Sequence, residues 1–360
     1  MNTMSPFLHR DLTQSDRPQA QTRMSRVAII IPTLNEAKHI TSVINSLSPQ
    51  ALRLDAMIVV VDGGSSDGTI QLVQHDATQR AGIVLLHNPE RLQSAAINLA
   101  VAHFGDQLDW IIRADAHAGY PDNYCDLLLH EARRTGADSV VVRMRATGSG
   151  FMQRNIATAQ NARVGNGGSQ HRMGCQGRFV DHGHHALIRV QAFRAVGGYD
   201  ATFSHNEDAE LDHRLTAAGF RIWLTGATRI DYFPRDSLRR LAAQYARFGA
   251  GRADTAGKHP GTLHMRHLVL IGLAPVALLS VAGIVTPLLA LPLGLWLTVC
   301  LLAGLATALR SRQIDMAFSG LPAAVMQMAW SFGFWSRFLA NAVHRTGRGR
   351  KWPPLMGEER

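Results

Sequence analysis

The segment from Leu268 to Leu309 constrains this chain more than any other, because its 42 consecutive residues carry no charged side chain. About 20 apolar residues are enough for a helix to cross a lipid bilayer, so the segment has room for two crossings. A Thr286-Pro287 pair interrupts it near the middle, and proline ends or kinks a helix. We therefore predict a hairpin of two membrane helices, over 268–285 and 288–309.

The outer ends of this hairpin are basic, whereas the loop between its two helices carries no charge. Three arginines flank the outer ends: Arg266, Arg310 and Arg312. Because Lys and Arg concentrate on the cytoplasmic side of membrane helices, both ends are expected in the cytoplasm. The membrane is expected to be the cell inner membrane.

A third apolar stretch, 317–343, is less uniform. It contains four residues that suit a surface better than a bilayer core, namely Pro322, Gln327, Arg337 and Asn341. A full crossing would carry the basic tail that follows, 344–360, to the outside, against the positive-inside rule. We therefore favour an interfacial or re-entrant segment, with a third crossing as the alternative. The whole membrane region is placed at 267–343.

The net charge of +10 is concentrated around this region. Residues 231–266 carry seven Lys and Arg against three acids, and residues 337–360 carry six against two. This distribution favours contact with anionic membrane lipid, and no pattern typical of nucleic-acid binding is present. We assign 235–266 to a basic amphipathic interface segment. The polar residues 1–25 lack the apolar core of a signal peptide and are expected to form a mobile tail.

Ahead of the membrane region, short β-rich runs alternate with helix-period segments. The runs cover 27–31, 57–61, 82–86 and the apolar stretch that begins at Asp109. Such alternation is typical of a mostly parallel sheet with helices on both faces, so we predict an α/β domain over 26–234. In sheets of this kind, ligands bind outside the carboxyl ends of the strands. That edge is where the sequence places Asn35, Glu36, Asp62 and Asp115.

Asp115 and His117 form a candidate metal site. Side chains two residues apart on a strand point to the same side, so a strand ending in Asp115-Ala-His117 could offer a carboxylate and an imidazole to one cation. For an isolated pair, a polar strand end with a hydrogen-bonded histidine is the alternative. Imidazole suits Mn²⁺ better than Mg²⁺, so manganese is favoured without excluding magnesium.

Three motifs, in this order and spacing, resemble the nucleotide-sugar half of family 2 glycosyltransferases with the Rossmann-like GT-A fold: Pro32–Glu36, Val60–Thr69 and Arg113–His117. The resemblance implies a UDP-sugar donor, whose uridine would be held by Pro32, Thr33, Asn35, Glu36 and Asp62. It places Arg91 and Asn98 near the ribose and phosphates, and a divalent metal on Asp115 and His117 at the diphosphate. The family usually has an aspartate where this chain has His117.

A second set of motifs resembles the acceptor half of the same family: Gly197–Asp200, Asn206–Asp208, Asp212–Arg214 and Ala218–Phe220. By this resemblance Asp208 is the catalytic base, and Glu207 orients the acceptor. Gln244, Arg247 and Phe248 resemble the family's Q-x-x-R-W element, with Phe in place of Trp, and are expected at the acceptor or its diphosphate. Together the motifs look most like the ExoA-type glucosyltransferases of succinoglycan assembly.

Two further features leave alternatives open. The glycine-rich segment 146–183 has no clear period and is expected to be a loop, in this fold one that closes over the donor. Three histidines follow it closely, His182, His184 and His185. One of them could supply a third metal ligand, although surface or core histidines are the commoner outcome. Glu210 and Asp212 are expected only to favour the start of a helix, where carboxylates are stabilised.

The sequence thus predicts a membrane-anchored, metal-dependent, inverting glycosyltransferase. It would move a hexose, with glucose favoured, from a UDP-sugar to a polyprenyl-diphosphate-linked saccharide in exopolysaccharide synthesis. The nearest alternative transfers the sugar directly to a polyprenyl phosphate. A processive polymer synthase fits less well, because the chain lacks a large set of channel-forming helices. A non-catalytic nucleotide-binding relic is the remaining alternative.

Overall fold

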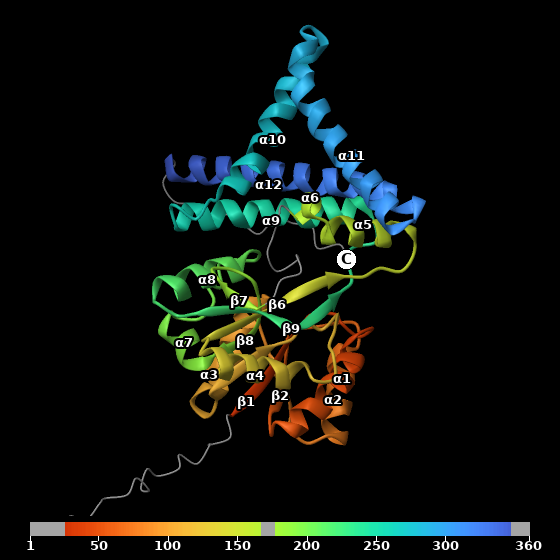
Figure 1. Cartoon of the computed structure of the whole chain (residues 1–360). Coiled ribbons are helices and arrows are strands. Elements are labelled where there is room, and N and C mark those ends of the chain that lie inside the picture. The colour runs from red at the N-terminus through yellow and green to blue at the C-terminus, as the bar shows by residue number, and fades with distance from the viewer. Residues whose placement is uncertain (1–25, 167–176, 347–360) are drawn as a thin grey trace, which may run out of the picture.

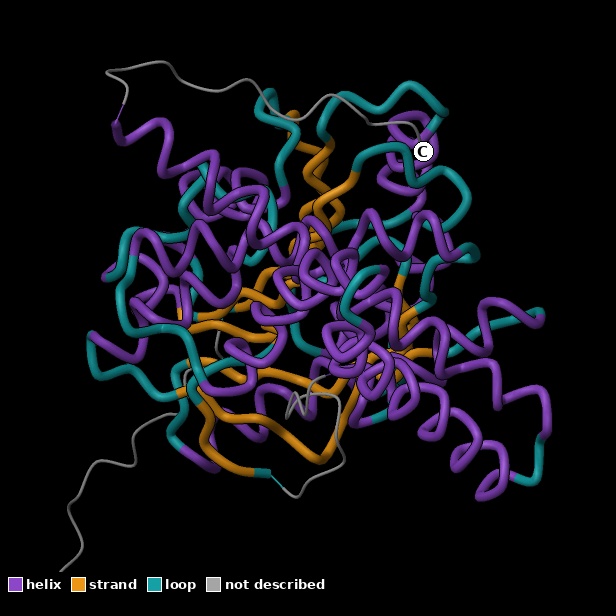
Figure 2. The backbone as a smooth tube through the Cα atoms, turned by 90° about the horizontal axis from the view of Figure 1, so that it is seen from above, coloured by secondary structure: helices purple, strands orange, loops and turns teal. Residues whose placement is uncertain are grey.

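The computed structural model describes residues 26–166 and 177–346. Figure 1 shows an α/β part built on one sheet and, above it, a layer of long helices from which α10 (Met265–Val281) and α11 (Leu291–Ser311) project. The view from above shows the helices of this layer lying over the strands (Figure 2). The predicted tail 1–25, and residues 347–360 of the predicted basic tail, lie outside the described residues.

Nine strands form one sheet in the described part of the chain, in the order β3-β2-β1-β4-β8-β6-β9-β5, with β7 also paired to β9. The strands are β1 (Val27–Thr33), β2 (Met57–Asp62), β3 (Ile83–His87), β4 (Trp110–Arg113), β5 (Ala118–Gly119), β6 (Ser139–Ala146), β7 (Arg178–Val180), β8 (His184–Arg189) and β9 (Ile222–Tyr232).

The first four strands are parallel, as the sequence predicts. β1 is buried on both faces, because Ile29 and Ile31 join the core cluster on one side and Ala28 and Ile30 join the cluster on the other. A run of apolar residues without polar alternation is the expected signature of such a strand. Parallel pairing brings the carboxyl ends of these strands to one edge, where the site lies.

The rest of the sheet is mixed, so the predicted mostly parallel sheet applies only to its first half. β8 runs antiparallel to both of its neighbours, β4 and β6, while β9 runs parallel to β6 and antiparallel to β5 and β7. Between β6 and β8 the chain forms α5 and α6 in the helix layer (Figure 1) and then β7, which pairs with the first residues of β9. Antiparallel strands need no long crossover connection, so β8 can lie directly beside β6.

Helices cover both faces of the sheet. Buried residues of α1, α2 and α4 belong to the core cluster on one face, and those of α3, α7 and α8 belong to the cluster on the other. The bounds are α1 (Ile40–Arg53), α2 (Thr69–Gln79), α3 (Gln93–Phe104), α4 (Tyr124–Thr135), α7 (Val190–Ala195) and α8 (Glu207–Ala217).

The helix layer consists of α5 (Phe151–Asn161), α6 (Arg163–Asn166), α9 (Leu238–Lys258) and α12 (Gly320–Thr346). The expectation of a loop over 146–183 is wrong for α5 and α6. Ile156 and Ala159 are buried against Leu241 of α9 and Met326 of α12. This burial stabilises α5, which the local sequence alone does not predict. Residues 167–176 of the expected loop lie outside the described chain.

α9 and α12 lie side by side in the layer (Figure 1). A Cβ atom on Gly249 would lie 1.9 Å from the carbonyl oxygen of Trp330, and one on Gly333 would lie 1.9 Å from that of Ala246. The two backbones can approach so closely only because both positions are glycine. Arg337 adds an ion pair to Asp254, with 2.8 Å between Nε and Oδ2.

Two helices of the described residues are long and apolar enough to cross a membrane, Met265–Ile284 and Pro287–Ser311. They match the predicted hairpin closely, with the break at Thr286-Pro287. Many of their large apolar side chains are exposed, for example Ile284 at 88% and Leu309 at 72%. The third apolar stretch forms α12, whose Asn341 donates to Asp254 of α9 at 2.8 Å. Its polar residues are thus used in packing within the layer.

Candidate active site

Two cavities meet at the carboxyl edge of the parallel strands. The central cavity, of about 490 Å³, is lined from below by strand-end residues and α8, and from above by α9, α10 and α12. The side cavity, of about 230 Å³, lies between the loops after β1, β3 and β4. Gln93, Asp115 and His117 line both cavities. A ligand that fills the side cavity can therefore reach into the central one.

The side cavity is lined by four of the residues predicted to hold a nucleotide besides Asp115: Pro32, Thr33, Glu36 and Arg91. The predicted Asp62 is buried behind it and organises the loop that follows β2. Its Oδ1 accepts from the backbone N–H groups of Gly64 and Ser65, each at 2.8 Å. Gly64 has φ of +87°, a conformation that favours glycine. The carboxylate thus fixes the shape of the loop.

Asn35 and Asn98 do not line either cavity. Asn35 joins the loops after β1 and β2, because its Oδ1 accepts from the N–H of Ser66 at 2.7 Å. Asn98 lies on α3, and its side-chain amide donates to the carbonyl of Tyr199 at 2.7 Å and accepts from the Tyr199 N–H at 2.9 Å. Asn98 therefore links α3 to the segment around Tyr199, and its place near the ribose and phosphates stays a prediction.

Arg113, the last residue of β4, is the centre of the site, and the sequence did not single it out. The guanidinium is buried and faces three carboxylates, with N–O distances of 2.5 Å to Asp208, 3.6 Å to Asp115 and 3.7 Å to Glu207. Burial would lower the pKa of Arg113, but Asp208 and the other acids raise it well above its usual range. A cation at the end of an apolar strand is the signal that could have revealed it.

Asp208 and Glu207 open α8 and line the central cavity. The Oδ1 atom of Asp208 accepts from Arg113 at 2.5 Å and from the hydroxyl of Tyr199 at 2.8 Å. Burial alone would raise the pKa of Asp208, but Arg113 holds it below the usual value. Glu207 has a weaker hold on Arg113, and burial together with the neighbouring Asp208 raises the pKa of Glu207 to about 7.

Asp115 and His117 lie beyond the end of β4, in the turn before β5, so the argument from strand periodicity is wrong for them. His117 Nδ1 lies 2.9 Å from Glu36 Oε1, and this contact raises the pKa of His117. Asp115 Oδ1 accepts from the Gln93 amide at 2.9 Å. His184 Nε2 lies 3.5 Å from Asp115 Oδ2. Burial opposes ionisation of Asp115, but His184 and Arg113 bring its pKa well below the usual range.

These residues fit a divalent cation in part. An ionised carboxylate beside an imidazole is a donor set that suits Mn²⁺, and of the three histidines it is His184 that lies beside Asp115, whereas His117 contacts Glu36. Within the described residues, however, no group of three or more His, Cys, Asp or Glu side chains is already arranged as a metal site. A cation at Asp115 would therefore need further ligands from the donor.

The other two histidines hold a buried acid. Asp212 lies between His182 and His185, with N–O distances of 2.6 Å and 2.7 Å. His185 Nδ1 also lies 2.9 Å from Ser139 Oγ. Burial would raise the pKa of Asp212, but His185 and His182 lower it to about 2. Asp212 therefore does more than favour the start of α8, because it fixes the segment that carries His184.

The face of α9 toward the central cavity carries two of the three predicted acceptor residues. Gln244 and Phe248 line the cavity, and the Gln244 amide donates to the hydroxyl of Tyr232 at 2.8 Å. Arg247 is exposed and is not part of the cavity wall. Arg247 lies only three residues from Gln244, so it is the packing of α9, and not helix periodicity, that leaves its side chain outside the wall.

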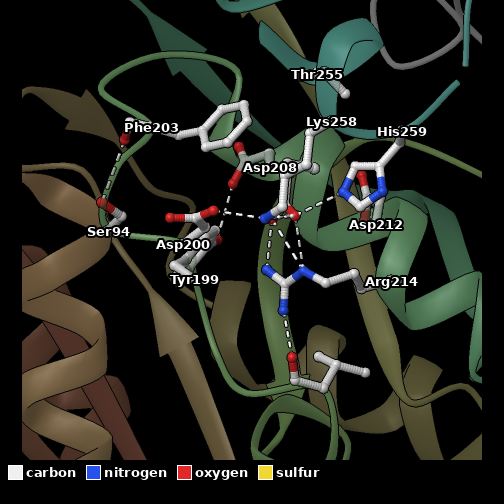
Figure 3. A network of polar contacts seen from close by, with 12 residues as sticks. Ser94, Tyr199, Asp200, Phe203, Asp208, Asp212, Arg214, Thr255, Lys258 and His259 are labelled. Atoms are coloured by element: carbon white, nitrogen blue, oxygen red, sulfur yellow. Dashed lines mark hydrogen bonds and ion pairs between the residues drawn. The ribbon is translucent and has the colours of Figure 1, made fainter. Parts of the chain in front are cut away.

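A polar network holds α9 against α8 on the other side of the acids (Figure 3). Lys258 donates to Asp200 at 2.5 Å and to the buried Glu210 at 2.6 Å. Glu210 also accepts from Arg214 and from His259, at 2.5 Å and 2.9 Å. Because Asp208 lies on the first turn of α8, this network fixes the acid relative to the helix layer.

Comparisons with known proteins agree with this arrangement. Residues 28–197 match the Glycosyl transferase family 2 domain. The chain is 47% identical over 311 residues to the succinoglycan biosynthesis protein ExoA of Rhizobium meliloti, covering 86% of this chain and 94% of that protein. It is 24% identical over 244 residues to a Methanococcus voltae dolichyl N-acetyl-α-D-glucosaminyl phosphate 3-β-D-2,3-diacetamido-2,3-dideoxy-β-D-glucuronosyltransferase, covering 64% of this chain and 73% of that protein.

A solved structure supports the fold. A mannosyltransferase from Pyrobaculum calidifontis, solved in complex with GDP-Man and Mn²⁺, superposes with a TM-score of 0.56 at 18% identity, over 89% of this chain and 88% of that one. At this identity the likeness concerns the fold alone, which is GT-A. The extensive identity with ExoA and the family 2 match together establish that this chain belongs to glycosyltransferase family 2.

Proposed function

We propose that this family 2 glycosyltransferase is an inverting enzyme that moves a hexose, with glucose favoured, from a UDP-sugar to a polyprenyl-diphosphate-linked saccharide. The reaction would take place at the cytoplasmic face of the inner membrane during exopolysaccharide synthesis. One observation carries the proposal: the cavity that holds Asp208 has the strand ends as one wall and the helices beside the two candidate membrane spans as the other.

The donor side rests on the side cavity. The loops after three parallel strands line it and contribute Glu36, Arg91 and Asp115. These loops lie at the carboxyl ends of the strands, where sheets of this kind bind nucleotides. Asp115 and His117 would hold a divalent cation, with His184 beside them. Such a cation would offset the charge that develops on the departing nucleoside diphosphate.

The acceptor side rests on the upper wall of the central cavity. Phe248, Leu270 and Trp330 line it, from α9, α10 and α12, and α10 continues into the first candidate span. A lipid-linked acceptor could therefore reach the acids from the bilayer. The names of two relatives fit this direction, because one acts in succinoglycan biosynthesis and the other on a dolichyl-linked sugar phosphate.

Asp208 is the proposed base. Its Oδ1 is occupied by Arg113 and Tyr199, which leaves Oδ2, 3.7 Å from His184 Nδ1, to take the proton of the acceptor hydroxyl. In a single displacement, the hydroxyl attacks the anomeric carbon as the bond to the nucleotide breaks. Inversion follows, so α-configured UDP-glucose gives a β-linked product. Glu207 would orient the acceptor. The intact group of three acids around Arg113 argues against a non-catalytic relic.

The test is a transfer screen with the purified full-length protein in detergent and Mn²⁺. UDP- and GDP-sugars are offered with a polyprenyl-diphosphate-linked saccharide, and separately with polyprenyl phosphate. A β-linked product on the lipid-linked saccharide, from a UDP-hexose, is expected. A sugar monophospholipid as the main product would support the alternative acceptor. An α-linked product from α-configured UDP-glucose would exclude the single displacement.

A further inference from the structure

We infer that Arg252 and Arg266 form the subsite that binds the diphosphate of the lipid-linked acceptor, at the membrane end of the central cavity. The inference rests on the proposed function and names the part of the site that recognises the acceptor's charge. The expectation drawn from the sequence placed Gln244, Arg247 and Phe248 at the acceptor or its diphosphate and did not include these two arginines.

Helix geometry places Arg252 on the right face of α9. Gln244, Phe248 and Arg252 follow one another at intervals of four residues, and all three line the central cavity. Residues spaced in this way lie on one face of a helix. Arg247 is exposed and does not line the cavity. The basic residue of α9 that a ligand in the cavity would meet is therefore Arg252.

The carboxylates of the cavity wall are confined to its strand end, where Arg113 and Arg235 also line it. Its three acids, Asp115, Glu207 and Asp208, all lie around Arg113 at the strand ends. Arg252 and Arg266, on α9 and at the start of α10, have no ion pair with any residue of the described chain. Asp212 attracts Arg252 from a distance, but two arginines without an ion-pair partner, on the wall of one cavity, create a site for an anion.

Arg252 is held in an unfavourable environment. Burial, together with repulsion from Arg266, lowers the pKa of Arg252 to about 10. The side chain remains protonated at neutral pH, so the folded protein keeps two like charges close together in a partly buried place. Such an arrangement is costly unless an anion relieves it. A diphosphate, with several oxygens able to accept from two guanidinium groups, would do so.

The surroundings of Arg266 indicate an anion that carries a lipid. Arg266 lies in the first turn of α10, and Leu270, one turn later, lines the same cavity. Trp330 of α12 completes an apolar wall beside it. A free diphosphate has no apolar group to pack against this wall, whereas the first isoprene units of a polyprenyl diphosphate would pack against it.

Binding of farnesyl diphosphate to the full-length protein in detergent tests the inference. Arg252→Gln and Arg266→Gln should each weaken this binding about ten- to a hundredfold, since a lost charge-assisted hydrogen bond is worth about 1.5–3 kcal/mol. Both variants should raise the KM for the lipid-linked acceptor more than they lower kcat. UDP binding, measured in parallel, should stay within about twofold of the wild type, because these arginines lie away from the side cavity. Circular dichroism confirms folding.

Arg239→Gln is the matched control, because it removes an exposed arginine from the same helix outside the cavity wall, and it should behave as wild type. Unchanged farnesyl diphosphate binding in Arg252→Gln and Arg266→Gln overturns the subsite. Loss in Arg247→Gln with retention in Arg252→Gln overturns it in favour of the sequence motif. Binding to phosphatidylglycerol vesicles is measured separately by flotation. If the arginine variants lose only this vesicle binding and keep farnesyl diphosphate binding, the arginines contact lipid head groups and the subsite is overturned.

The same experiment separates this inference from the proposed function. If the wild type glycosylates a polyprenyl-diphosphate-linked saccharide and the arginine variants keep its KM, the subsite fails alone. If the wild type neither binds farnesyl diphosphate nor uses a diphosphate-linked acceptor, the proposed function fails together with the subsite.

Discussion

Arg113 shares its charge unequally among three carboxylates, and the inequality decides which of them carries a proton. Asp208 lies 2.5 Å from the guanidinium, whereas Asp115 and Glu207 lie 3.6 Å and 3.7 Å away. Glu207 is also next to Asp208, and its pKa is raised to about 7. Below that pH, a neutral Glu207 therefore stands beside an ionised Asp208.

Glu207 should give the reaction a pH dependence near neutrality. Its carboxyl group is protonated below about pH 7 and ionised above it, and the added negative charge makes Asp208 a stronger base. We expect kcat/KM to rise through neutral pH in the wild type and Glu207→Gln to flatten this rise. A wild-type profile that is flat on both sides of neutrality would contradict the assignment.

Thermal unfolding provides a second readout for Glu207. The folded-state pKa of about 7 exceeds the ordinary value of 4.5, so the unfolded chain loses this proton first as the pH rises. The free energy of unfolding of the wild type should therefore fall as the pH rises from the ordinary pKa of 4.5 to the folded-state pKa of about 7, and the loss should be complete above that pH. Glu207→Gln should lack that loss, and its melting temperature should fall less over the same range.

Asp115→Ala should abolish metal-dependent UDP binding and leave the fold intact, because Arg113 keeps Asp208 and Glu207 as partners. The measurement is UDP affinity with Mn²⁺ and with EDTA, by calorimetry. Asp106→Ala, which removes an exposed carboxylate that pairs with Arg194, should bind as wild type does. Equal wild-type affinity with and without EDTA would refute the metal assignment.

Asp208→Asn should keep donor and metal binding and slow transfer by at least about a hundredfold, the contribution expected of a general base. The amide oxygen of asparagine can still accept from Arg113 and Tyr199, so the geometry should survive. Single-turnover transfer to the lipid-linked acceptor measures the effect. Normal turnover would move the base to another group, and Glu207 would be the first to examine.

At the scale of single residues, the sequence predicted which residues gather in one site, but it did not predict the contacts that each residue makes there. Asp115, Glu207, Asp208, Gln244 and Phe248 all line the central cavity, as expected of one site. Arg113 was missed because its role depends on acids 95 residues away in the chain. Arg247 does not line the cavity, because a motif gives residue identity, while the helix face that meets the cavity is set by packing; its role at the acceptor stays a prediction.

At the scale of elements, the contact between α9 and α12 decides whether the helix layer forms. Gly249→Ala should drive a Cβ atom into the backbone of Trp330, which would lie 1.9 Å away. Overpacking of this kind costs about 1–3 kcal/mol, so we expect a melting temperature several degrees lower. Gly272→Ala in α10, where no atom lies within 4 Å of the added Cβ, is the control. Equal stability of the two variants would contradict the close contact.

The elements themselves were predictable where their burial is local. The runs expected at 27–31, 57–61 and 82–86 form β1, β2 and β3, and the apolar stretch that begins at Asp109 contains β4. α5 and α6 were not predicted, because their apolar residues are buried against Met326, more than 150 residues later in the chain. The antiparallel direction of β8 could not be predicted either, since an apolar run does not indicate whether its neighbouring strands are parallel or antiparallel to it.

At the scale of the molecule, two candidate spans place both ends of the hairpin on one side of a membrane. A green fluorescent protein reporter fused after the last residue should fluoresce in cells, and alkaline phosphatase at that position should be inactive. Phosphatase inserted at Thr286-Pro287 should be active, because that turn would lie on the opposite side. Activity only from a periplasmic reporter at the C-terminus would refute the even number of crossings and leave the enzymatic proposal untouched.

In Figure 1, α9 and α12 lie between α8, which carries Asp208, and the projecting ends of α10 and α11. They would therefore set the height between a bilayer and Asp208. An acceptor held by its diphosphate at the membrane end of the central cavity would present only the sugars that fit within that height. Once one more sugar is attached, the new chain end stands farther from the bilayer than the base. The protein would then act as a gauge of chain length, adding one unit and rejecting its own product.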